Sequence, residues 1–153
     1  MISRRHFLLL GAMATPALAQ LDPNIAAKRK AALDEAVRAV TRGVQLRPGR
    51  VKLDVPPLVD NGNTVPITVT VESPMTQADH VKAITVLTEK NPQPYVLRAH
   101  LGPRAGRAIV SVRGRIADTG NVIAIAEMSD GSFWSDTISV VVTLSACLED
   151  GLI

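Results

Sequence analysis

The spacing of apolar residues changes near residue 48, and this change divides a predicted helix from a series of predicted strands. Over residues 22–44, apolar side chains recur every three or four positions, which places them on one face of a helix. Pro23 is tolerated in a first helical turn, and Gly43 marks the predicted end. The basic residues 28–30 are predicted to form a solvated face. The predicted apolar face consists of Leu33, Val37, Val40 and Val44.

After Pro48-Gly49, short apolar segments alternate with turn residues. Residues 65–72 alternate between the two faces of a half-buried strand. Asn61-Gly62 and Asp130-Gly131 are typical of tight turns between strands. Seven strands after a single helix predict a mainly β protein, an immunoglobulin-like antiparallel β-sandwich with one N-terminal helix. The strands are predicted at residues 51–55, 65–72, 81–87, 95–101, 107–116, 121–128 and 133–144.

Residues 1–19 have the pattern of an export signal rather than of a folded element. Arg4 and Arg5 supply a positive start, a short apolar run follows, and Ala17-Leu18-Ala19 is a small-residue cleavage site. The apolar run is too short to span a membrane. The arginine pair followed by apolar residues matches a twin-arginine-type signal peptide. The sequence therefore predicts a periplasmic protein that begins at Gln20.

Cleavage after residue 19 would leave 134 of the 153 residues and lower the net charge from +3 to +1, because two arginines are lost. A near-neutral chain with 3% aromatic residues lacks the basic patches and stacking rings of a nucleic-acid surface. No second apolar segment reaches membrane-spanning length. We therefore expect neither nucleic-acid nor membrane binding. The predicted parts are a helix and linker (20–50), a β-sandwich (51–144) and a C-terminal arm (145–153).

The polar residues do not form a recognisable enzyme active site. His80 and His100 lie in or beside different predicted strands, and their spacing makes a weak case for a metal ligand pair. Cys147, His100 and an aspartate could form a hydrolase triad, but no local motif supports one. Glu127 and Asp130 are interpreted as surface and turn residues. The sequence therefore predicts no catalytic, metal-binding or cofactor-binding residue, and no enzyme activity of its own.

Cys147 is the single cysteine of the chain, so it cannot close an intramolecular disulfide. It lies near the end of the sequence, where chain segments are commonly exposed unless something holds them. It also follows a β-type run over residues 138–144. Two interpretations stay open. Cys147 is a reactive thiol that the rest of the protein presents, or it is a small hydrophobic side chain buried at the end of the last strand.

Three segments carry a resemblance to a known family. They are Glu72-Ser73-Pro74-Met75-Thr76, Thr88-Glu89-Lys90-Asn91-Pro92-Gln93-Pro94 and Ala126-Glu127-Met128-Ser129-Asp130-Gly131-Ser132-Phe133. In this order they resemble SoxY, the sulfur-carrier subunit of bacterial thiosulfate oxidation. The resemblance implies a twin-arginine signal, an N-terminal helix on an immunoglobulin-like sandwich, and a heterodimer with a SoxZ subunit. It also implies a C-terminal arm whose cysteine, here Cys147, carries sulfur intermediates to successive Sox enzymes.

The resemblance weakens around the cysteine. The family arm reads Gly-Gly-Cys-Gly-Gly, whereas Ser145-Ala146 precede Cys147 here and Leu148-Glu149 follow it. Glycines give such an arm conformational freedom, and nearby carboxylates disfavour a thiolate. A diverged carrier of another sulfur species, a carrier that lost its function and an altered tail are all compatible with this sequence.

Two functions follow from these observations. The first is a periplasmic covalent carrier of sulfur intermediates in the oxidation of thiosulfate or other reduced sulfur compounds, with Cys147 as the attachment site. The alternative is a binding or structural module that pairs with a SoxZ-type partner and carries no sulfur, because the glycine-flanked arm is lost.

Overall fold

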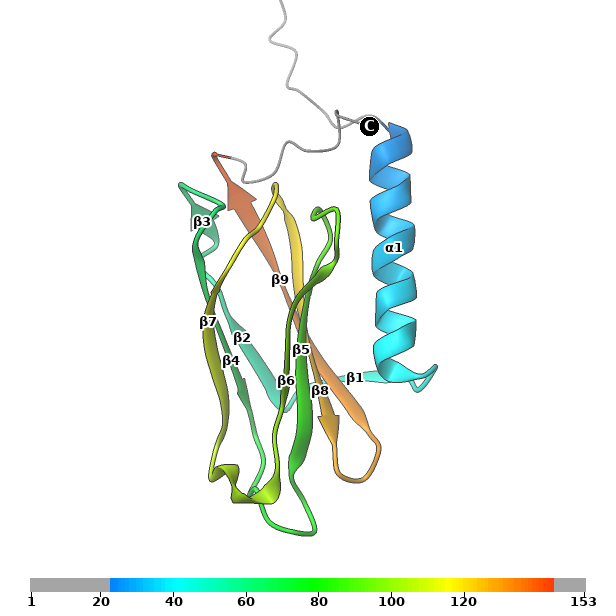
Figure 1. The fold of residues 1–153 in the computed structure, drawn as a ribbon, viewed down its shortest axis with the longest axis vertical. Coiled ribbons are helices and arrows are strands. Elements are labelled where there is room, and N and C mark those ends of the chain that lie inside the picture. The colour runs from blue at the N-terminus through cyan, green and yellow to red at the C-terminus, as the bar shows by residue number, and fades with distance from the viewer. Residues whose placement is uncertain (1–22, 145–153) are drawn as a thin grey trace, which may run out of the picture.

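One α-helix and two packed β-sheets make up residues 23–144, the part of the chain that the computed structural model describes (Figure 1). The helix is α1 (Pro23–Thr41). The strands are β1 (Leu46–Pro48), β2 (Val51–Asp54), β3 (Leu58–Val59), β4 (Val65–Val71), β5 (Val81–Thr88), β6 (Tyr95–His100), β7 (Ala108–Gly114), β8 (Gly120–Met128) and β9 (Phe133–Val142). The larger sheet has the order β1-β9-β8-β5-β6, β3 also pairs with β9, and the smaller sheet has the order β2-β4-β7. The predicted fold class is confirmed.

The core between the sheets is built mainly of valine and isoleucine, because the strands present alternate residues to it. In β4, Val65, Ile67 and Val69 are at most 1% exposed, while the residues between them point outward. β4 pairs antiparallel with β2 on one side and with β7 on the other. Each fully buried side chain of this size contributes about 1.5–3 kcal/mol to folding. The inward-facing side chains of the alternation predicted for residues 65–72 therefore help to hold the smaller sheet against the larger one.

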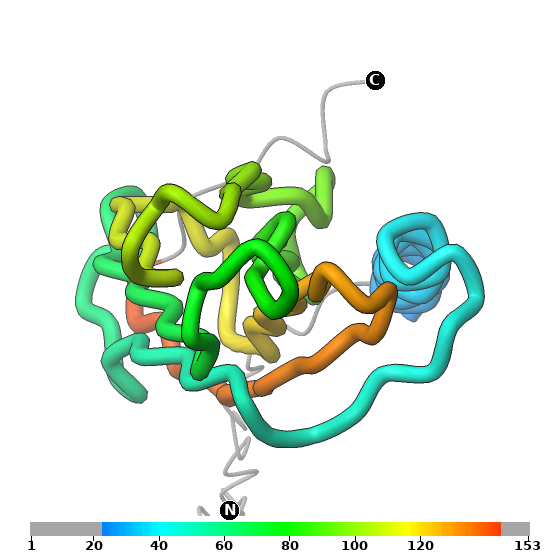
Figure 2. Tube along the Cα trace, turned by 90° about the horizontal axis from the view of Figure 1, so that it is seen from below, coloured from blue at the N-terminus to red at the C-terminus, as the bar shows by residue number. Residues whose placement is uncertain are grey.

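Helix α1 packs beside the larger sheet (Figures 1 and 2). Its buried apolar residues are three or four positions apart, as expected for one helical face. They form a second apolar cluster with residues from β5, β8 and β9, separate from the core between the sheets. The buried members of this cluster are Leu33, Ala36, Val40, Leu87, Ile125 and Phe133.

The helix is shorter than predicted. It ends at Thr41 because Arg42 and Gly43 have φ angles of 54° and 80°, outside the helical region. Val44 is consequently 46% exposed and does not belong to the apolar face. The prediction for residues 28–30 is also wrong in part, because Arg29 is buried while its two neighbours are exposed.

Two short strands that the sequence did not indicate pair with β9. β1 lies in the predicted linker and runs parallel to the start of β9, with Leu46 opposite Phe133. β3 runs parallel to the end of β9, with Leu58 opposite Val141. The pairing of these two strands departs from the expected antiparallel arrangement. Together they cover both ends of the β9 edge that faces away from β8, which limits its freedom to pair with other chains.

A carboxylate links the two sheets between these short strands. The backbone N–H of Leu53 in β2 donates a hydrogen bond of 2.9 Å to Oδ2 of Asp136 in β9. The other carboxylate oxygen accepts the backbone N–H of Thr137. Asp136 therefore occupies part of the free edge of β2 and connects it to β9.

Strands β6 and β7 follow one another in the chain but belong to different sheets. They are joined by a 3₁₀ turn, η1 (Pro103–Ala105). Near the other end of the two strands, a Cβ on Gly114 would lie 2.7 Å from Cγ1 of Val96 and 3.1 Å from Cδ1 of Ile67. The absent side chain thus permits the close approach of β6 and β7 that closes this side of the sandwich.

Candidate functional site

Cys147, the predicted site residue, lies outside the described residues. The structure does show how the chain is held just before it, at the end of β9. After β9, the N–H of Thr143 donates to the carbonyl of Val59, at 3.0 Å. The carbonyl of Leu144 accepts the N–H of Gly62, also at 3.0 Å. These bonds hold the backbone in place up to three residues before Cys147. The start of the tail is therefore fixed to the loop between β3 and β4.

Exposed apolar side chains surround this point. Leu58 and Val141 are opposite each other on β3 and β9, and they are 59% and 47% exposed. Leu144 is 60% exposed. We call these three residues the root patch. Exposed large apolar residues that gather at one place on a small protein are typical of contact surfaces.

A buried carboxylate joins α1 to the sheet. Glu127 in β8 accepts a hydrogen bond of 2.8 Å from Arg42, just after the helix, and one of 3.2 Å from Lys82 in β5. Its side chain is only 7% exposed. Burial alone would raise the pKa of Glu127, but the hydrogen bonds and charges of Lys82 and Arg42 outweigh it and hold this pKa below its ordinary value. The interpretation of Glu127 as a surface residue is wrong. Its ion pairs are a structural link.

The two histidines lie near this link. His80 and His100 line a depression of about 430 Å³ together with Glu127, Lys82 and Arg98. The Nδ1 atom of His80 is 3.1 Å from the carbonyl oxygen of Thr76. Over residues 23–144, no group of three or more His, Cys, Asp or Glu side chains is placed to hold a metal ion. The depression is therefore lined mainly by basic side chains, and its one carboxylate, that of Glu127, is already paired.

Trp134 in β9 lies close to two arginines. The guanidinium carbons of Arg47 and Arg50 are 5.8 Å and 5.7 Å from its ring centre, within the range of cation–π contacts. Arg50 also forms an ion pair of 3.1 Å with Asp79. Asp130, as predicted, is a turn residue: it accepts hydrogen bonds from the N–H and hydroxyl of Ser132. These contacts fix the turns at one end of the sandwich.

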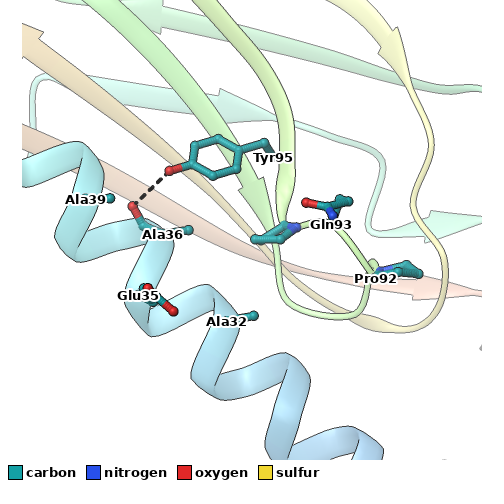
Figure 3. A pocket seen from close by; sticks show the side chains of 8 residues that line it. Ala32, Glu35, Ala36, Ala39, Pro92, Gln93 and Tyr95 are labelled. Atoms are coloured by element: carbon teal, nitrogen blue, oxygen red, sulfur yellow. Dashed lines mark hydrogen bonds between the residues drawn. The ribbon is translucent and has the colours of Figure 1, made fainter.

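A groove of about 350 Å³ separates α1 from the turn before β6 (Figure 3). The Tyr95 hydroxyl donates a 3.4 Å hydrogen bond to the carbonyl of Ala36, so its polar atom is satisfied within the protein. Glu35 is the single ionisable group in the lining besides Tyr95, and no second acid, base or nucleophile is beside it. The lining is Ala32, Glu35, Ala36, Ala39, Pro92, Gln93, Pro94 and Tyr95.

Among the residues that the structure describes, no helix is long and apolar enough to cross a membrane.

A family model described as "Sulfur oxidation protein SoxY" matches residues 37–147, most of the chain. The chain belongs to the SoxY family. The match begins within α1, covers the whole sandwich and ends at Cys147. No curated protein sequence matches the chain.

Solved structures agree with this membership. The chain is similar to the sulfur carrier protein SoxY from Chlorobium limicola f thiosulfatophilum, with 26% identity and a TM-score of 0.62 over 74% of this chain and 98% of that one. It also resembles a superoxide reductase (neelaredoxin) from Ignicoccus hospitalis, with 17% identity and a TM-score of 0.55 over 68% and 86% of the two chains. A putative superoxide reductase from Thermotoga maritima has 20% identity and a TM-score of 0.53 over 63% and 93%. The last two share the fold.

The three segments that carry the SoxY resemblance form turns. The hydroxyl of Ser73 accepts the N–H of Met75, which has a φ angle of 50°. The Ser129 hydroxyl accepts a hydrogen bond from the N–H of His80, and the Ser129 N–H donates one to the His80 carbonyl. Residues 88–94 form the turn between β5 and β6, which the N–H of Thr88 closes by bonding to the Pro94 carbonyl at 2.8 Å. These SoxY-like residues therefore shape the scaffold rather than a reaction site.

Proposed function

We propose that this SoxY-family protein carries sulfur intermediates covalently during the oxidation of thiosulfate or other reduced sulfur compounds, and that Cys147 is the attachment site. The observation that carries the proposal is the family match, which ends on the chain's single cysteine. The similarity to a solved sulfur carrier protein, which extends over nearly all of that protein, supports it further. Partner enzymes form and oxidise the carried group, and this chain is not itself an enzyme.

The fold suits such a role because it fixes the chain at a point close to Cys147 in the sequence. Backbone hydrogen bonds hold the chain as far as Leu144. Cys147 is the third residue after Leu144, so a fully extended chain would carry it about 10 Å from that point, at roughly 3.3 Å per residue. The thiolate is the reactive form of cysteine, and Glu149 and Asp150 disfavour it by their negative charge. We therefore expect Cys147 to load more slowly than a cysteine flanked by glycines.

Location and partners belong to the same proposal. Residues 1–19 act as a twin-arginine-type signal that directs the protein to the periplasm. A SoxZ-like subunit pairs with the sandwich, and Sox enzymes act on the arm. The physical support for pairing is the pair of open strand edges at β6 and β7, since each of these strands has a neighbour on one side only.

The export step has a direct test. Because the cleavage site ends at Ala19, protein isolated from the periplasm should begin at Gln20, and N-terminal sequencing reads this directly. Arg4→Lys with Arg5→Lys should retain the precursor in the cytoplasm if the twin-arginine route is used. A cellular protein that keeps Met1 would contradict export.

The second candidate function is a binding module without sulfur chemistry. The observation that favours it is the loss of the glycine flanks, with Ala146 and Leu148 beside the cysteine. In that case Cys147 is an apolar side chain covered by the protein or its partner.

Alkylation separates the two functions. The folded protein is treated with iodoacetamide and weighed intact, and Cys147→Ser is the control. A carrier should gain one adduct at Cys147 within minutes under native conditions, whereas Cys147→Ser should gain none. If Cys147 reacts only after unfolding in denaturant, the carrier proposal fails and the binding module is favoured.

A further inference from the structure

Charge is divided unevenly over this protein. Between Lys90 and Asp118 the chain has five arginines and no aspartate or glutamate. The rest of residues 20–153 holds ten lysines and arginines against fourteen aspartates and glutamates. A chain that is nearly neutral as a whole therefore concentrates its positive charge in one segment. The five residues, which we call the arginine edge, are Arg98, Arg104, Arg107, Arg113 and Arg115.

The fold places this segment along one side of the sandwich. It comprises β6, η1, β7 and the residue after β7, and β7 lies on the side away from α1 (Figure 1). All five arginines are exposed, and none forms an ion pair with another residue of the range 23–144. Glu72, just after β4, is the acidic residue next in register to Arg107, and no ion pair joins them. The positive charge is therefore not used within the described fold.

Neighbouring charges do not cancel the arginine edge. Arg98 shares the depression beside β6 with His100, Lys82 and Glu127. Glu127 is already bound by two cations, Lys82 and Arg42, so this region keeps a net positive charge. An acidic group that approached β6 would meet unpaired guanidinium groups without a competing free carboxylate.

Apolar side chains and open backbone lie between the arginines. Val96, Val110 and Val112 are half-buried and pack against the core from β6 and β7. Each of these strands pairs on one side only, so each leaves a row of N–H and C=O groups without a strand partner. Aliphatic residues flanked by arginines are the composition of a protein interface. Nucleic acid fits less well, because 3% aromatic residues provide few stacking surfaces.

We propose that the arginine edge docks an acidic face of the partner subunit in the heterodimer. The proposal rests on the pairing stated under the proposed function, and it names the surface and the partner's chemistry. Arg98 lies on the face of the larger sheet that packs against α1, and Arg113 lies on the outer face of the smaller sheet. The partner therefore reaches around the open edge, supplies carboxylates on both sides of it, and covers Val96, Val110 and Val112.

Leu144 follows β9, and Gly62 joins it to the Arg115 end of the arginine edge: the Gly62 N–H donates to the Leu144 carbonyl, and the Ile116 N–H donates to the Gly62 carbonyl. The bound partner thus lies close to the start of the tail.

Charge reversal tests this docking. The full-length mature chain is titrated with the purified SoxZ-like subunit of the same organism, and the dissociation constant is measured at several salt concentrations. Arg98→Glu, Arg107→Glu and Arg113→Glu are combined in one variant. Like charges across an interface oppose association, so we expect affinity to fall by at least about 100-fold at about 0.1 M salt. The loss should shrink as salt rises.

The matched control reverses the same number of charges elsewhere. Lys28→Glu, Arg38→Glu and Lys52→Glu lie on exposed positions of α1 and β2 and change the net charge equally. We expect this control to change affinity by less than about 5-fold, because it acts only through the overall field. Both variants should keep the wild-type melting temperature within about 3 °C, since none of these six arginines and lysines forms an ion pair in the described residues.

Three outcomes would overturn the proposal. In the first, the edge variant and the control variant bind the subunit equally well. In the second, the wild-type chain forms no complex with the subunit. In the third, charge reversal leaves the heterodimer unchanged but abolishes self-association of the isolated chain, which would mean that the arginine edge joins copies of this protein. The intact mass of the same protein samples shows whether Cys147 carries sulfur, and this measurement does not depend on the binding experiment. A failed docking experiment with sulfur still on Cys147 therefore contradicts the surface and leaves the carrier function standing.

Discussion

Asp136 shows how much one side chain contributes to the union of the two sheets. Its carboxylate accepts the N–H of Leu53 from the free edge of β2, at 2.9 Å. We predict that Asp136→Ala lowers the free energy of unfolding by about 1–2 kcal/mol, because a partly buried N–H loses its charged acceptor. Asp136→Asn keeps an oxygen acceptor at the same place and should recover about half of the loss. Chemical denaturation with urea measures both, and equal stability of Asp136→Ala and wild type would contradict this role.

Glu127 gives the protein a pH dependence of known sign. Its folded pKa lies below the ordinary value of 4.5, so the carboxylate stabilises the fold fully above that pH. This contribution is lost as the pH falls through the folded pKa. We predict that Glu127→Gln is about 1–2 kcal/mol less stable than wild type at pH 7. The difference should narrow as the pH is lowered from about 5 to about 3.

Unfolding curves at each pH measure this difference, and Glu72→Gln, an exposed residue without an ion pair, is the matched control. A gap between Glu127→Gln and wild type that stays constant across this range would mean that the ion pairs contribute nothing.

At the scale of residues, the sequence predicted the alternation of β4 well and the fate of charged residues poorly. Val65 and Ile67 are buried because period two places them inward, and this pattern is visible in the sequence. The local pattern around Glu127 predicts a surface residue, because the partners that pair with it are 45 and 85 positions away. The lysines on both sides of Arg29 likewise predict a solvated face. Pairings across such distances are decided by the fold, which a local pattern does not contain.

Among the elements, β9 holds the fold together and also leads to the tail. It pairs with β8 along most of its length and with β1 and β3 at its two ends. The long strands were predictable because each has enough residues to show a period. β1 and β3 have three and two residues, which are too few to show any period in the sequence. These strands form because the edge of β9 is available for pairing, and only the fold shows that edge.

Gly114 tests the contact between β6 and β7. A methyl group at this position would lie 2.7 Å from Cγ1 of Val96, closer than side-chain carbons approach. Valine has no flexible end that could move away, so we predict that Gly114→Ala lowers the free energy of unfolding by about 1–3 kcal/mol. Val96→Ala in the same chain should restore part of that loss by making room. The double-mutant cycle is read by urea denaturation, and strictly additive effects would contradict the close contact.

At the scale of the whole molecule, the two contact surfaces are neighbours. The arginine edge follows β6 and β7, and its Arg115 end approaches the start of the tail, because Gly62 bonds to both Leu144 and Ile116. A partner on the arginine edge therefore lies close to the root patch.

The fold class and the SoxY resemblance followed from the sequence, and the structure and the family match confirm both. The site remains a prediction, because Cys147 lies outside the described residues. The arginine edge could have been found in the sequence as five arginines in a segment without acidic residues. What the sequence lacked was the knowledge that this segment forms one side of the sandwich, with open strand edges.

The most direct measurement of the central claim is the intact mass of the protein from cells that oxidise thiosulfate. Wild-type protein, purified without reducing agent, should show added masses of sulfur atoms or of thiosulfate-derived groups. These additions should disappear on treatment with a thiol reductant, and they should be absent from Cys147→Ser. If the wild-type protein from such cells has only its unmodified mass while thiosulfate is being oxidised, Cys147 carries no sulfur and the proposed function is wrong.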